Sequence, residues 1–334
     1  MIRVALDAMG GDLAPAAPVA GAVTALSEIA DDVVVQLVGE RDAIARELAG
    51  VHYDPGRIEV VEAPEVIGMG ERPLQALRAK RGSSIQVGLE LQRAGRSDAF
   101  ISGGNTGALM AASTLVLRLL PGFERPAIGA AIPTVDHTVL LVDAGANVDC
   151  SPQELVSFAH LGVAYARDAL GRPDPGVGLL NIGEEREKGN AASREAFRLL
   201  RESGLRFVGN VEGRDILHGR THTDVFDVVV CDGFVGNVLL KFYESVAHLF
   251  ESLVRRELGG EVADSDAMAR IVRYIDYAEY GGAPLLGVRG ISIVCHGRSH
   301  SGAFVSAIHV AERAARNHLA QHFSREFSAE GVTP

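Results

Sequence analysis

Apolar residues in this chain follow two alternating patterns. Short runs rich in Val, Ile and Leu, such as VVVQLVG at residues 33–39, are typical of strands buried on both faces. Between them, apolar residues recur every three or four positions, which predicts amphipathic helices. The predicted strands cover residues 2–8, 33–39, 57–63, 98–102, 127–132, 138–143, 176–182, 205–210, 227–232 and 291–295. The predicted helices cover residues 15–30, 40–49, 73–94, 106–119, 152–170, 190–203, 235–258, 264–279 and 302–323.

This alternation of continuous apolar strands with helices predicts an α/β fold. We expect a doubly wound, mostly parallel sheet of the Rossmann-like kind, with helices on both faces. Residues 1–323 are expected to form a single unit, and two lobes meeting at a central cleft are the alternative arrangement. The helical stretch at residues 239–280 is expected to protrude, and residues 324–334 are expected to form a flexible tail.

Polar residues or glycines directly follow seven of the predicted strands. Ligands bind outside the carboxyl ends of the strands in an open parallel sheet, so these residues are expected to converge on one shared site. The set comprises Asp7, Gly10, Gly11 and Asp12; Ser102, Asn105 and Thr106; Asp143 and Asn147; Asn181 and Glu184; Asn210 and Glu212; Asp232 and Asn237; and His296 and Ser299.

Two glycine-rich turns indicate an anion site. The stretch ISGGNTGALMA, residues 101–111, passes from a strand end into a helix start. Backbone N–H groups at a helix start attract anions, and glycines allow a ligand to approach the backbone closely. We interpret Gly104 to Thr106 as an oxyanion site, and a plain strand-to-helix turn is the alternative. The turn DAMGGD, residues 7–12, predicts a similar approach, with a structural role for its carboxylates as the alternative.

Three further turns carry titratable groups. In NIGEEREKGN, residues 181–190, Lys188 lies close to Gly183 and suits contacts to phosphate; a solvated loop is the alternative. Lys241 follows Asn237 by about one helical turn and is expected on the same face, with a merely solvated lysine as the alternative. His296 can transfer a proton at neutral pH, with a structural histidine as the alternative.

Composition excludes several classes of protein. A net charge of −11 argues against a general nucleic-acid binder, and the longest apolar runs are far shorter than the roughly 20 residues that a membrane span needs. The first residues predict a strand rather than a signal peptide. Cys150, Cys231 and Cys295 form neither a CxxC pair nor a disulfide framework, which predicts reduced thiols in a cytosolic protein. We predict no metal site and no cofactor.

An amphipathic helical pair is predicted late in the chain. Apolar residues from 246 to 254 share one side of the first helix, and a second helix follows a Gly-Gly break at residues 259–260. Such a pair is expected to pack in a dimer, and contact with a membrane surface is the alternative.

Several long stretches together resemble one family. The chain resembles the bacterial acyl-carrier-protein-dependent phosphate acyltransferases of phospholipid synthesis, the PlsX family, from the first strand to about residue 310. The matching stretches are ALDAMGGDLAP, GSSIQVGLELQRAGRSDAFISGGNTGALMA, LLVDAGANVDCSP, GLLNIGEEREKGN, FVGNVEGRDI, DVVVCDGFVGNVLLK and GAPLLGVRGISIVCHGRS. The resemblance implies a fold related to phosphate acetyltransferases and to isocitrate and isopropylmalate dehydrogenases.

The resemblance also implies a reaction and its partners. A long-chain acyl group passes from acyl carrier protein (ACP) to inorganic phosphate, giving acyl phosphate and free ACP by direct attack on the thioester. A downstream membrane glycerol-3-phosphate acyltransferase receives the product, and the enzyme is expected to be a cytoplasmic homodimer with peripheral membrane contact. Asn181, Lys188, Lys241 and His296 are the expected catalytic residues.

Two further needs of that reaction have candidate residues. Acidic ACP requires a local basic patch, for which the hypothesis is Arg255, Arg256, Arg270 and Arg273. A long acyl tail requires an apolar groove, and the helices after residues 106 and 235 are the candidates.

Three rival functions remain open. A nicotinamide-dependent dehydrogenase of related fold lacks support because GxGxxG is absent. A non-catalytic scaffold would not need polar groups at so many strand ends. A coenzyme A-dependent phosphate acetyltransferase differs only in its acyl donor.

Overall fold

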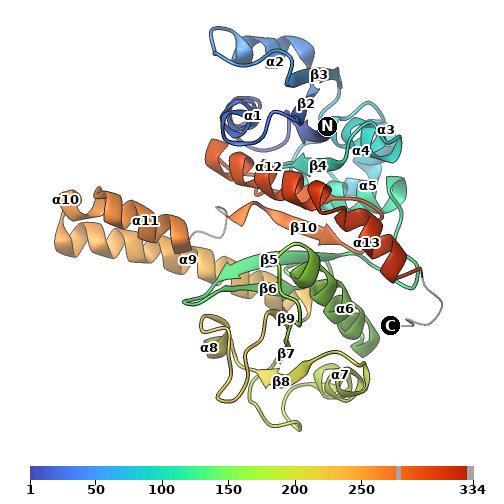
Figure 1. Ribbon diagram of the computed structural model, residues 1–334, viewed down its shortest axis with the longest axis vertical. Coiled ribbons are helices and arrows are strands. Elements are labelled where there is room, and N and C mark those ends of the chain that lie inside the picture. Colours follow the sequence, from blue (N-terminus) through green and yellow to red (C-terminus); the bar gives the residue numbers. More distant parts are fainter. Residues whose placement is uncertain (276–279, 329–334) are drawn as a thin grey trace. The chain divides into compact units, whose positions relative to one another are not determined.

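The computed structural model describes residues 1–275 and 280–328 of the chain (Figure 1). The strands are β1 (Ile2–Asp7), β2 (Val33–Gly39), β3 (Ile58–Glu62), β4 (Ala99–Ser102), β5 (Ala127–Pro133), β6 (Thr138–Val142), β7 (Val177–Leu180), β8 (Phe207–Val211), β9 (Val228–Val230), β10 (Ala283–Leu286) and β11 (Ser292–Val294). The helices are α1 (Ala16–Glu28), α2 (Arg41–Leu48), α3 (Pro73–Ala79), α4 (Ser84–Arg93), α5 (Thr106–Val116), α6 (Pro152–Asp168), α7 (Ala191–Glu202), α8 (Gly213–Ile216), α9 (Gly233–Leu258), α10 (Gly260–Ala263), α11 (Asp266–Ile275), α12 (Ser301–Arg316) and α13 (Leu319–Glu326).

The chain forms two compact units. The first comprises residues 1–126 and the described chain from Tyr280 onward, and the second comprises Ala127–Glu279 without its undescribed last residues. In the first unit the strand order is β3-β2-β1-β4-β11-β10. All neighbours there pair in parallel except β10, which is antiparallel to β11. The carboxyl ends of β1, β4 and β11 therefore lie side by side.

The second unit has the same logic. Its strand order is β5-β6-β9-β7-β8, and only β5 is antiparallel to its neighbour. The carboxyl ends of β6, β9, β7 and β8 consequently meet along one edge. Strands such as β9 are wholly buried, because helices cover both faces of the sheet and leave no solvated side.

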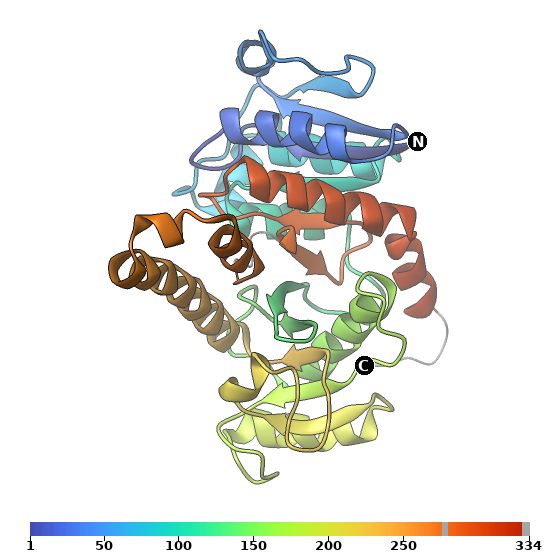
Figure 2. The ribbon, with the colours of Figure 1, turned by 60° about the vertical axis from the view of Figure 1, so that its left-hand side comes forward.

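Helices cover both faces of each sheet. In the first unit α1 packs against α12 over one face, while α4 and α5 pack together over the other (Figure 2). In the second unit α6 contacts α7, β6 and β9, and α9 contacts β6 (Figure 1). This arrangement confirms the predicted mostly parallel α/β fold.

One predicted helix proves to be two. Residues 73–94 divide into α3 and α4, because the chain breaks at Lys80 and restarts after Ser83. Gln86 on α4 stabilises the break by donating from its Nε2 to the carbonyls of Leu77 and Lys80, at 2.9 and 2.7 Å. Apolar spacing continues across the break, so the periodicity alone does not reveal it.

The carboxyl-terminal part of the chain differs from the expectation in three ways. Residues 302–323 form α12 and part of α13, with a left-handed His318 between them. Strand β10 was not predicted, because it is only four residues long and contains Pro284. The predicted tail from Ser324 begins too early. Helix α13 continues to Glu326, and Phe327 packs edge-to-face on Phe123 at 4.8 Å between ring centroids; residues 329–334 lie outside the described chain.

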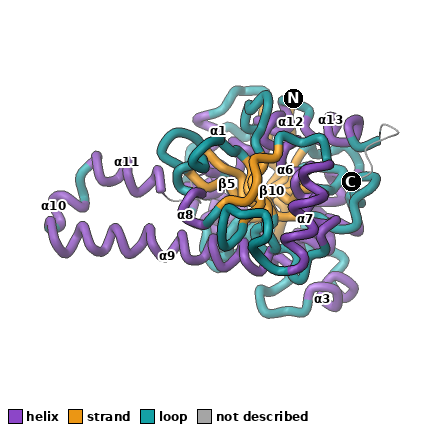
Figure 3. Tube along the Cα trace, turned by 90° about the horizontal axis from the view of Figure 1, so that it is seen from below, coloured by secondary structure: helices purple, strands orange, loops and turns teal. Residues whose placement is uncertain are grey.

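Helices α9, α10 and α11 form an excursion from the second unit. Helix α9 extends beyond its sheet, and α10 and α11 return alongside it (Figure 3). The second predicted helix, 264–279, is present as α11 up to Ile275, and residues 276–279 lie outside the described chain. Among the described residues, no helix combines the length and continuous apolarity needed to cross a lipid bilayer. A dimer and a membrane contact of this excursion stay predictions.

Replacing Phe327 is expected to loosen α13. Phe327 is buried against Phe123 and Phe323, and removing a buried phenyl ring costs about 3 kcal/mol or more. In Phe327→Ala, amide hydrogen exchange in α13 should accelerate by roughly two orders of magnitude. The exposed Ser328→Ala serves as the control, and unchanged protection of α13 in Phe327→Ala would show that the aromatic cluster does not hold the helix.

Candidate active site

A buried carboxylate organises the carboxyl end of β1 in the first unit. Ser102 Oγ donates to Asp7 Oδ2 at 2.7 Å, and the Met9 N–H donates to Oδ1 at 3.0 Å. Ser102 Oγ in turn accepts the Gly104 N–H at 3.0 Å. Burial raises the pKa of Asp7, while the bond from Ser102 acts in the opposite direction. The Asp7 carboxylate therefore ties the β1 turn to the β4 turn.

The glycines of these two turns permit their close approach. A Cβ at Gly10 would lie 2.4 Å from Asp7 Oδ2 and 2.7 Å from the Gly104 nitrogen, so no other residue fits. Gly11 has a φ of +108°, and the Asp12 N–H donates to the carbonyl of Gly297 at 2.6 Å. The turns after β1, β4 and β11 thus contact one another, as the strand order requires.

Asn105 caps α5 and anchors a neighbouring loop. Its Oδ1 accepts the Ala108 N–H at 3.0 Å, and its Nδ2 lies within 3.0–3.2 Å of the carbonyls of Gly68, Met69 and Glu71. Asn105 therefore caps α5 with its side-chain oxygen and holds the neighbouring loop with its side-chain amide. Within the described chain, no acceptor takes the first-turn N–H groups of Thr106 and Gly107, which suits an anion.

His296 and Ser299 complete this first cluster. The Arg298 N–H donates to His296 Nδ1 at 3.1 Å, and the Ser299 N–H donates to the His296 carbonyl at 2.9 Å. The imidazole of His296 is exposed at the end of β11, and Ser299 is buried.

Asp143 organises a turn in the second unit, as Asp7 does in the first. Its side chain is fully buried and accepts N–H groups from Ile128, Ala146 and Asn147 at 2.9, 3.0 and 2.6 Å. Asn147 Nδ2 adds a further bond at 2.9 Å. Burial raises the pKa of Asp143, and these donors partly offset the effect. The carboxylate fixes the turn from β6 into α6.

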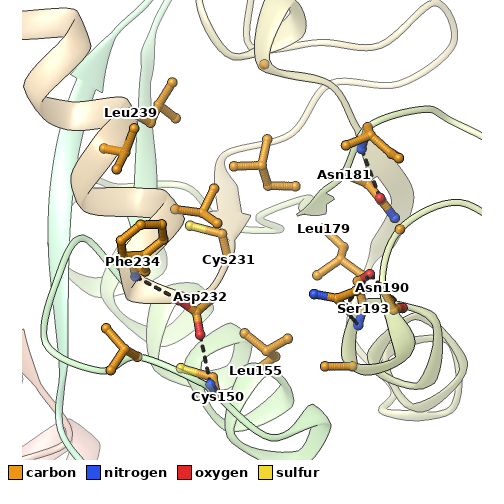
Figure 4. Close-up of a pocket in the computed structure, with 18 of the residues that line it drawn as sticks. Cys150, Leu155, Leu179, Asn181, Asn190, Ser193, Cys231, Asp232, Phe234 and Leu239 are labelled. Carbon is orange, nitrogen blue, oxygen red and sulfur yellow. Dashed lines mark hydrogen bonds between the residues drawn. The ribbon is translucent and has the colours of Figure 1, made fainter.

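Asp232 and Asn237 join that turn to α9. Asp232 Oδ1 accepts the Phe234 N–H and Oδ2 accepts the Cys150 N–H, both at 2.8 Å (Figure 4). A Cβ at Gly145 would lie 3.1 Å from the Cβ of Asn237, so Asn237 lies directly over this turn. One aspartate thus caps α9 and positions the chain before α6.

An amide pair holds the turn after β7. Asn181 Nδ2 donates to Asn210 Oδ1 at 3.0 Å and approaches the Lys188 carbonyl at 3.2 Å. Asn210 Nδ2 donates to the Glu185 carbonyl at 2.8 Å. Asn210 is almost fully buried, whereas Lys188 is exposed. Asn181 and Asn210 therefore shape the turn that carries Lys188.

The charged candidates pair with near neighbours at the surface. Lys188 Nζ lies 3.9 Å from Glu185, and Lys241 Nζ lies 3.0 Å from Glu244. Lys241 therefore faces Glu244 here rather than joining Asn237 over the Asp143 turn. The carboxylates of Glu184 and Glu212 both lie near Arg214, at 4.0 and 3.0 Å, and Gly183 packs against the Lys188 side chain. Exposed pairs of this kind hold their partners weakly.

The predicted docking arginines are also partly paired. Arg255 bonds to Asp264 and Arg256 to Glu257, at 2.8 and 2.7 Å, while Arg270 is exposed on α11. The side chain of Arg273 lies outside the described residues.

A large pocket adjoins the second cluster. It has a volume of about 1370 Å³ and is lined by residues of α6, β7, α7, α8 and α9 together with their connecting turns (Figure 4). Asn181, Asn190, Ser193 and Asp232 give it a polar rim, while Phe234, Val238 and Phe242 give it an apolar wall. Asn190 caps α7 by accepting the Ser193 N–H. Sequence reasoning missed Asn190 and Ser193. The helix after residue 235, one of its two candidates for an apolar groove, forms the apolar wall.

The thiols near these clusters are poor nucleophiles. Burial raises the pKa of Cys150 and of Cys295 to about 12 in each case, and it raises the pKa of Cys231 as well. Nearby Asp143 and Asp232 raise the pKa of Cys231 further. Within the described chain, no group of three His, Cys, Asp or Glu side chains is placed to hold a metal ion. What these clusters offer is N–H donors, amides and cations.

Comparison with known proteins assigns the class of protein. The family model described as "Fatty acid synthesis protein" matches residues 2–322. Phosphate acyltransferase from Desulforamulus reducens is 46% identical over 318 residues, covering 93% of each chain. That from Heliobacterium modesticaldum is 46% identical over 323 residues, with the same coverage. A phosphotransacetylase from Streptococcus pyogenes has the same fold, with a TM-score of 0.63 at 14% identity and 94% of each chain covered.

The fold and relatives define an α/β acyltransferase enzyme. The chain belongs to the phosphate acyltransferase family, which confirms the resemblance seen in the sequence. The rival class of nicotinamide-dependent dehydrogenase is therefore dropped, although its fold is related: 4-hydroxythreonine-4-phosphate dehydrogenase from Klebsiella pneumoniae gives a TM-score of 0.54 at 16% identity, covering 96% of this chain and 99% of its own. The roles of individual site residues stay predictions.

The native thiols are expected to resist alkylation. An ordinary thiol has a pKa of 9.0, whereas Cys295 has a pKa of about 12, so its thiolate at pH 8 is about a thousandfold scarcer. The folded pKa lies above the unfolded one, so reactivity should appear on unfolding or as the pH rises toward 12. Iodoacetamide labelling followed by peptide mass spectrometry measures this. Cys295→Ala should keep turnover within about twofold; rapid native labelling of Cys295 with loss of turnover would contradict the assignment.

Proposed function

We propose that this enzyme transfers a long-chain acyl group from acyl-ACP to inorganic phosphate. A phosphate oxygen attacks the thioester carbonyl carbon, the carbon–sulfur bond breaks, and the ACP thiolate leaves and takes up a proton. The products are acyl phosphate and free ACP. The observation that carries the proposal is the large pocket with an apolar wall and a polar rim, in a chain whose family is named for fatty acid synthesis. Relatives named phosphate acyltransferase support phosphate as the acceptor of the acyl group.

The chemistry suits positioning and electrostatics. Phosphate is already a nucleophile and a thiolate is a fair leaving group, so no covalent residue is required. In the second unit, we assign phosphate binding to Lys188 and Lys241, and oxyanion stabilisation to amide and cationic donors after β7 and β9. The raised pKa of the buried thiols supports a route without an acyl-enzyme.

The direct test is turnover with defined donors. Purified protein is mixed with palmitoyl-ACP, with and without phosphate, and acyl phosphate is trapped with hydroxylamine. Phosphate-dependent release of free ACP with matching hydroxamate is the expected result. Lys188→Ala should raise the KM for phosphate by about tenfold or more, since a charge-assisted contact is worth about 1.5–3 kcal/mol. Turnover only with acetyl-CoA would favour the phosphate acetyltransferase alternative, whose fold this chain shares, and no turnover with any donor would favour a scaffold.

Further partners belong to the same proposal. The enzyme is proposed to act as a cytoplasmic homodimer with peripheral membrane contact, passing acyl phosphate to a membrane glycerol-3-phosphate acyltransferase. Exposed Leu249 and Phe250 on α9 support an interface on this excursion. Sedimentation of Leu249→Glu against the parent chain tests the dimer, and unchanged association would reject this face.

ACP docking is proposed on the arginines of α9 and α11. Arg270 is exposed, whereas Arg255 and Arg256 already pair with acidic neighbours, so Arg270 should contribute most. Arg270→Glu is expected to raise the KM for acyl-ACP severalfold in low salt and to leave the KM for phosphate unchanged, because long-range charge attraction is screened by salt. Steady-state kinetics at two ionic strengths measure this, and an unchanged KM in low salt would exclude Arg270 from docking.

A further inference from the structure

The wall of the pocket exposes large apolar side chains to solvent. Ile182, in the turn after β7, is 80% exposed, and Phe242, two turns along α9, is 66% exposed. Phe234 and Val238 on α9 and Val148 before α6 are also exposed and line the same pocket. A contiguous apolar surface of this kind marks a ligand or partner site, because removing apolar area from water is favourable.

The polar residues of the pocket lining belong to the turns after the strands and to the start of α7. Asn181, Ser193 and Asp232 lie on the side of the strand ends, whereas Phe242 lies about 15 Å along α9 from Asp232, given a rise of 1.5 Å per residue. The Asp232 carboxylate is committed to the Phe234 and Cys150 N–H groups, which fixes the start of this wall (Figure 4). A long ligand with a polar head and an apolar tail matches this gradient.

The shape favours a small amphiphile over a protein surface. A volume of about 1370 Å³ is at least that of typical ligand pockets, roughly 300–1,000 Å³, and its lining comes from five elements and their turns rather than from one helix face. Leu115 on α5, the other helix that the sequence offered as a groove, is exposed but does not line this pocket.

We propose that this pocket binds the acyl chain of the substrate, with the thioester end at the rim of Asn181, Ser193 and Asp232 and the tail along α9 toward Phe242. This inference rests on the proposed function. It adds where the acyl chain binds and which residue limits the length of that acyl chain. Val238 lies between rim and end, so its size sets how far the tail can extend.

A tryptophan reporter tests the location without turnover. The chain has no Trp, so Phe242→Trp and Leu115→Trp each carry a single reporter. Dibromostearic acid quenches indole fluorescence on contact. Saturable quenching in Phe242→Trp, with none in Leu115→Trp, is the expected result. Val238→Trp is a second pocket reporter should Phe242→Trp fold poorly. Quenching of Leu115→Trp alone, or of neither pocket reporter, would overturn the proposal.

A substitution that fills the pocket tests whether Val238 limits the length of the acyl chain. Val238→Phe should lower kcat/KM for stearoyl-ACP relative to octanoyl-ACP by at least about tenfold, since each displaced methylene is worth roughly fourfold. Val246→Phe makes the same change farther along α9, outside the pocket lining, and should leave the ratio unchanged. An unchanged ratio in Val238→Phe would overturn the proposal.

These outcomes are separable from failure of the proposed function. If the parent protein forms acyl phosphate while neither pocket reporter is quenched, the acyl chain binds elsewhere and only this inference fails. If no donor yields acyl phosphate, the proposed function fails whatever the fluorescence shows.

Discussion

Two buried aspartates at strand ends, one in each unit, hold the turns from which the candidate site residues come. Asp7 closes β1 and binds Ser102, and Asp143 closes β6 and binds the backbone as far as Asn147. Burying a carboxylate is costly unless donors surround it, and here those donors are the turns themselves. Each carboxylate thereby converts separate strand ends into one shaped surface, and glycines such as Gly10 leave room for the contact. The turns cannot move far without leaving the carboxylate buried and unsatisfied.

Burial beside these ordered turns also lowers the reactivity of the neighbouring thiols. Cys231 lies against the carbonyl of Asp143, and its pKa rises with burial and with the neighbouring carboxylates. What remains for chemistry is an array of amides, N–H groups and surface cations, next to an apolar pocket. In the proposed reaction, such an array would orient phosphate and thioester and stabilise the developing charge without a covalent residue.

The sequence predicted the fold well because buried parallel strands leave continuous apolar runs. It also identified the polar strand ends, since topology alone brings the turns after β1, β4 and β11 together. It did not reveal what each side chain does there. Asn105 and Asn181 look like ligand donors in sequence, yet both hold turns in the structure. Lys241 pairs with Glu244, and the apolar wall that includes Ile182 becomes visible only when β7 and α9 are packed. The spacing of residues along one helix or strand predicts which face they share. Contacts between elements determine what each side chain does.

The central claim is that phosphate attacks the thioester directly. The sharpest measurement incubates the enzyme with palmitoyl-ACP in the absence of phosphate and determines the intact mass of the denatured protein. The account predicts an unmodified mass and no release of free ACP until phosphate is added. A mass increase of one palmitoyl group, with a matching amount of free ACP, would establish an acyl-enzyme and contradict the account.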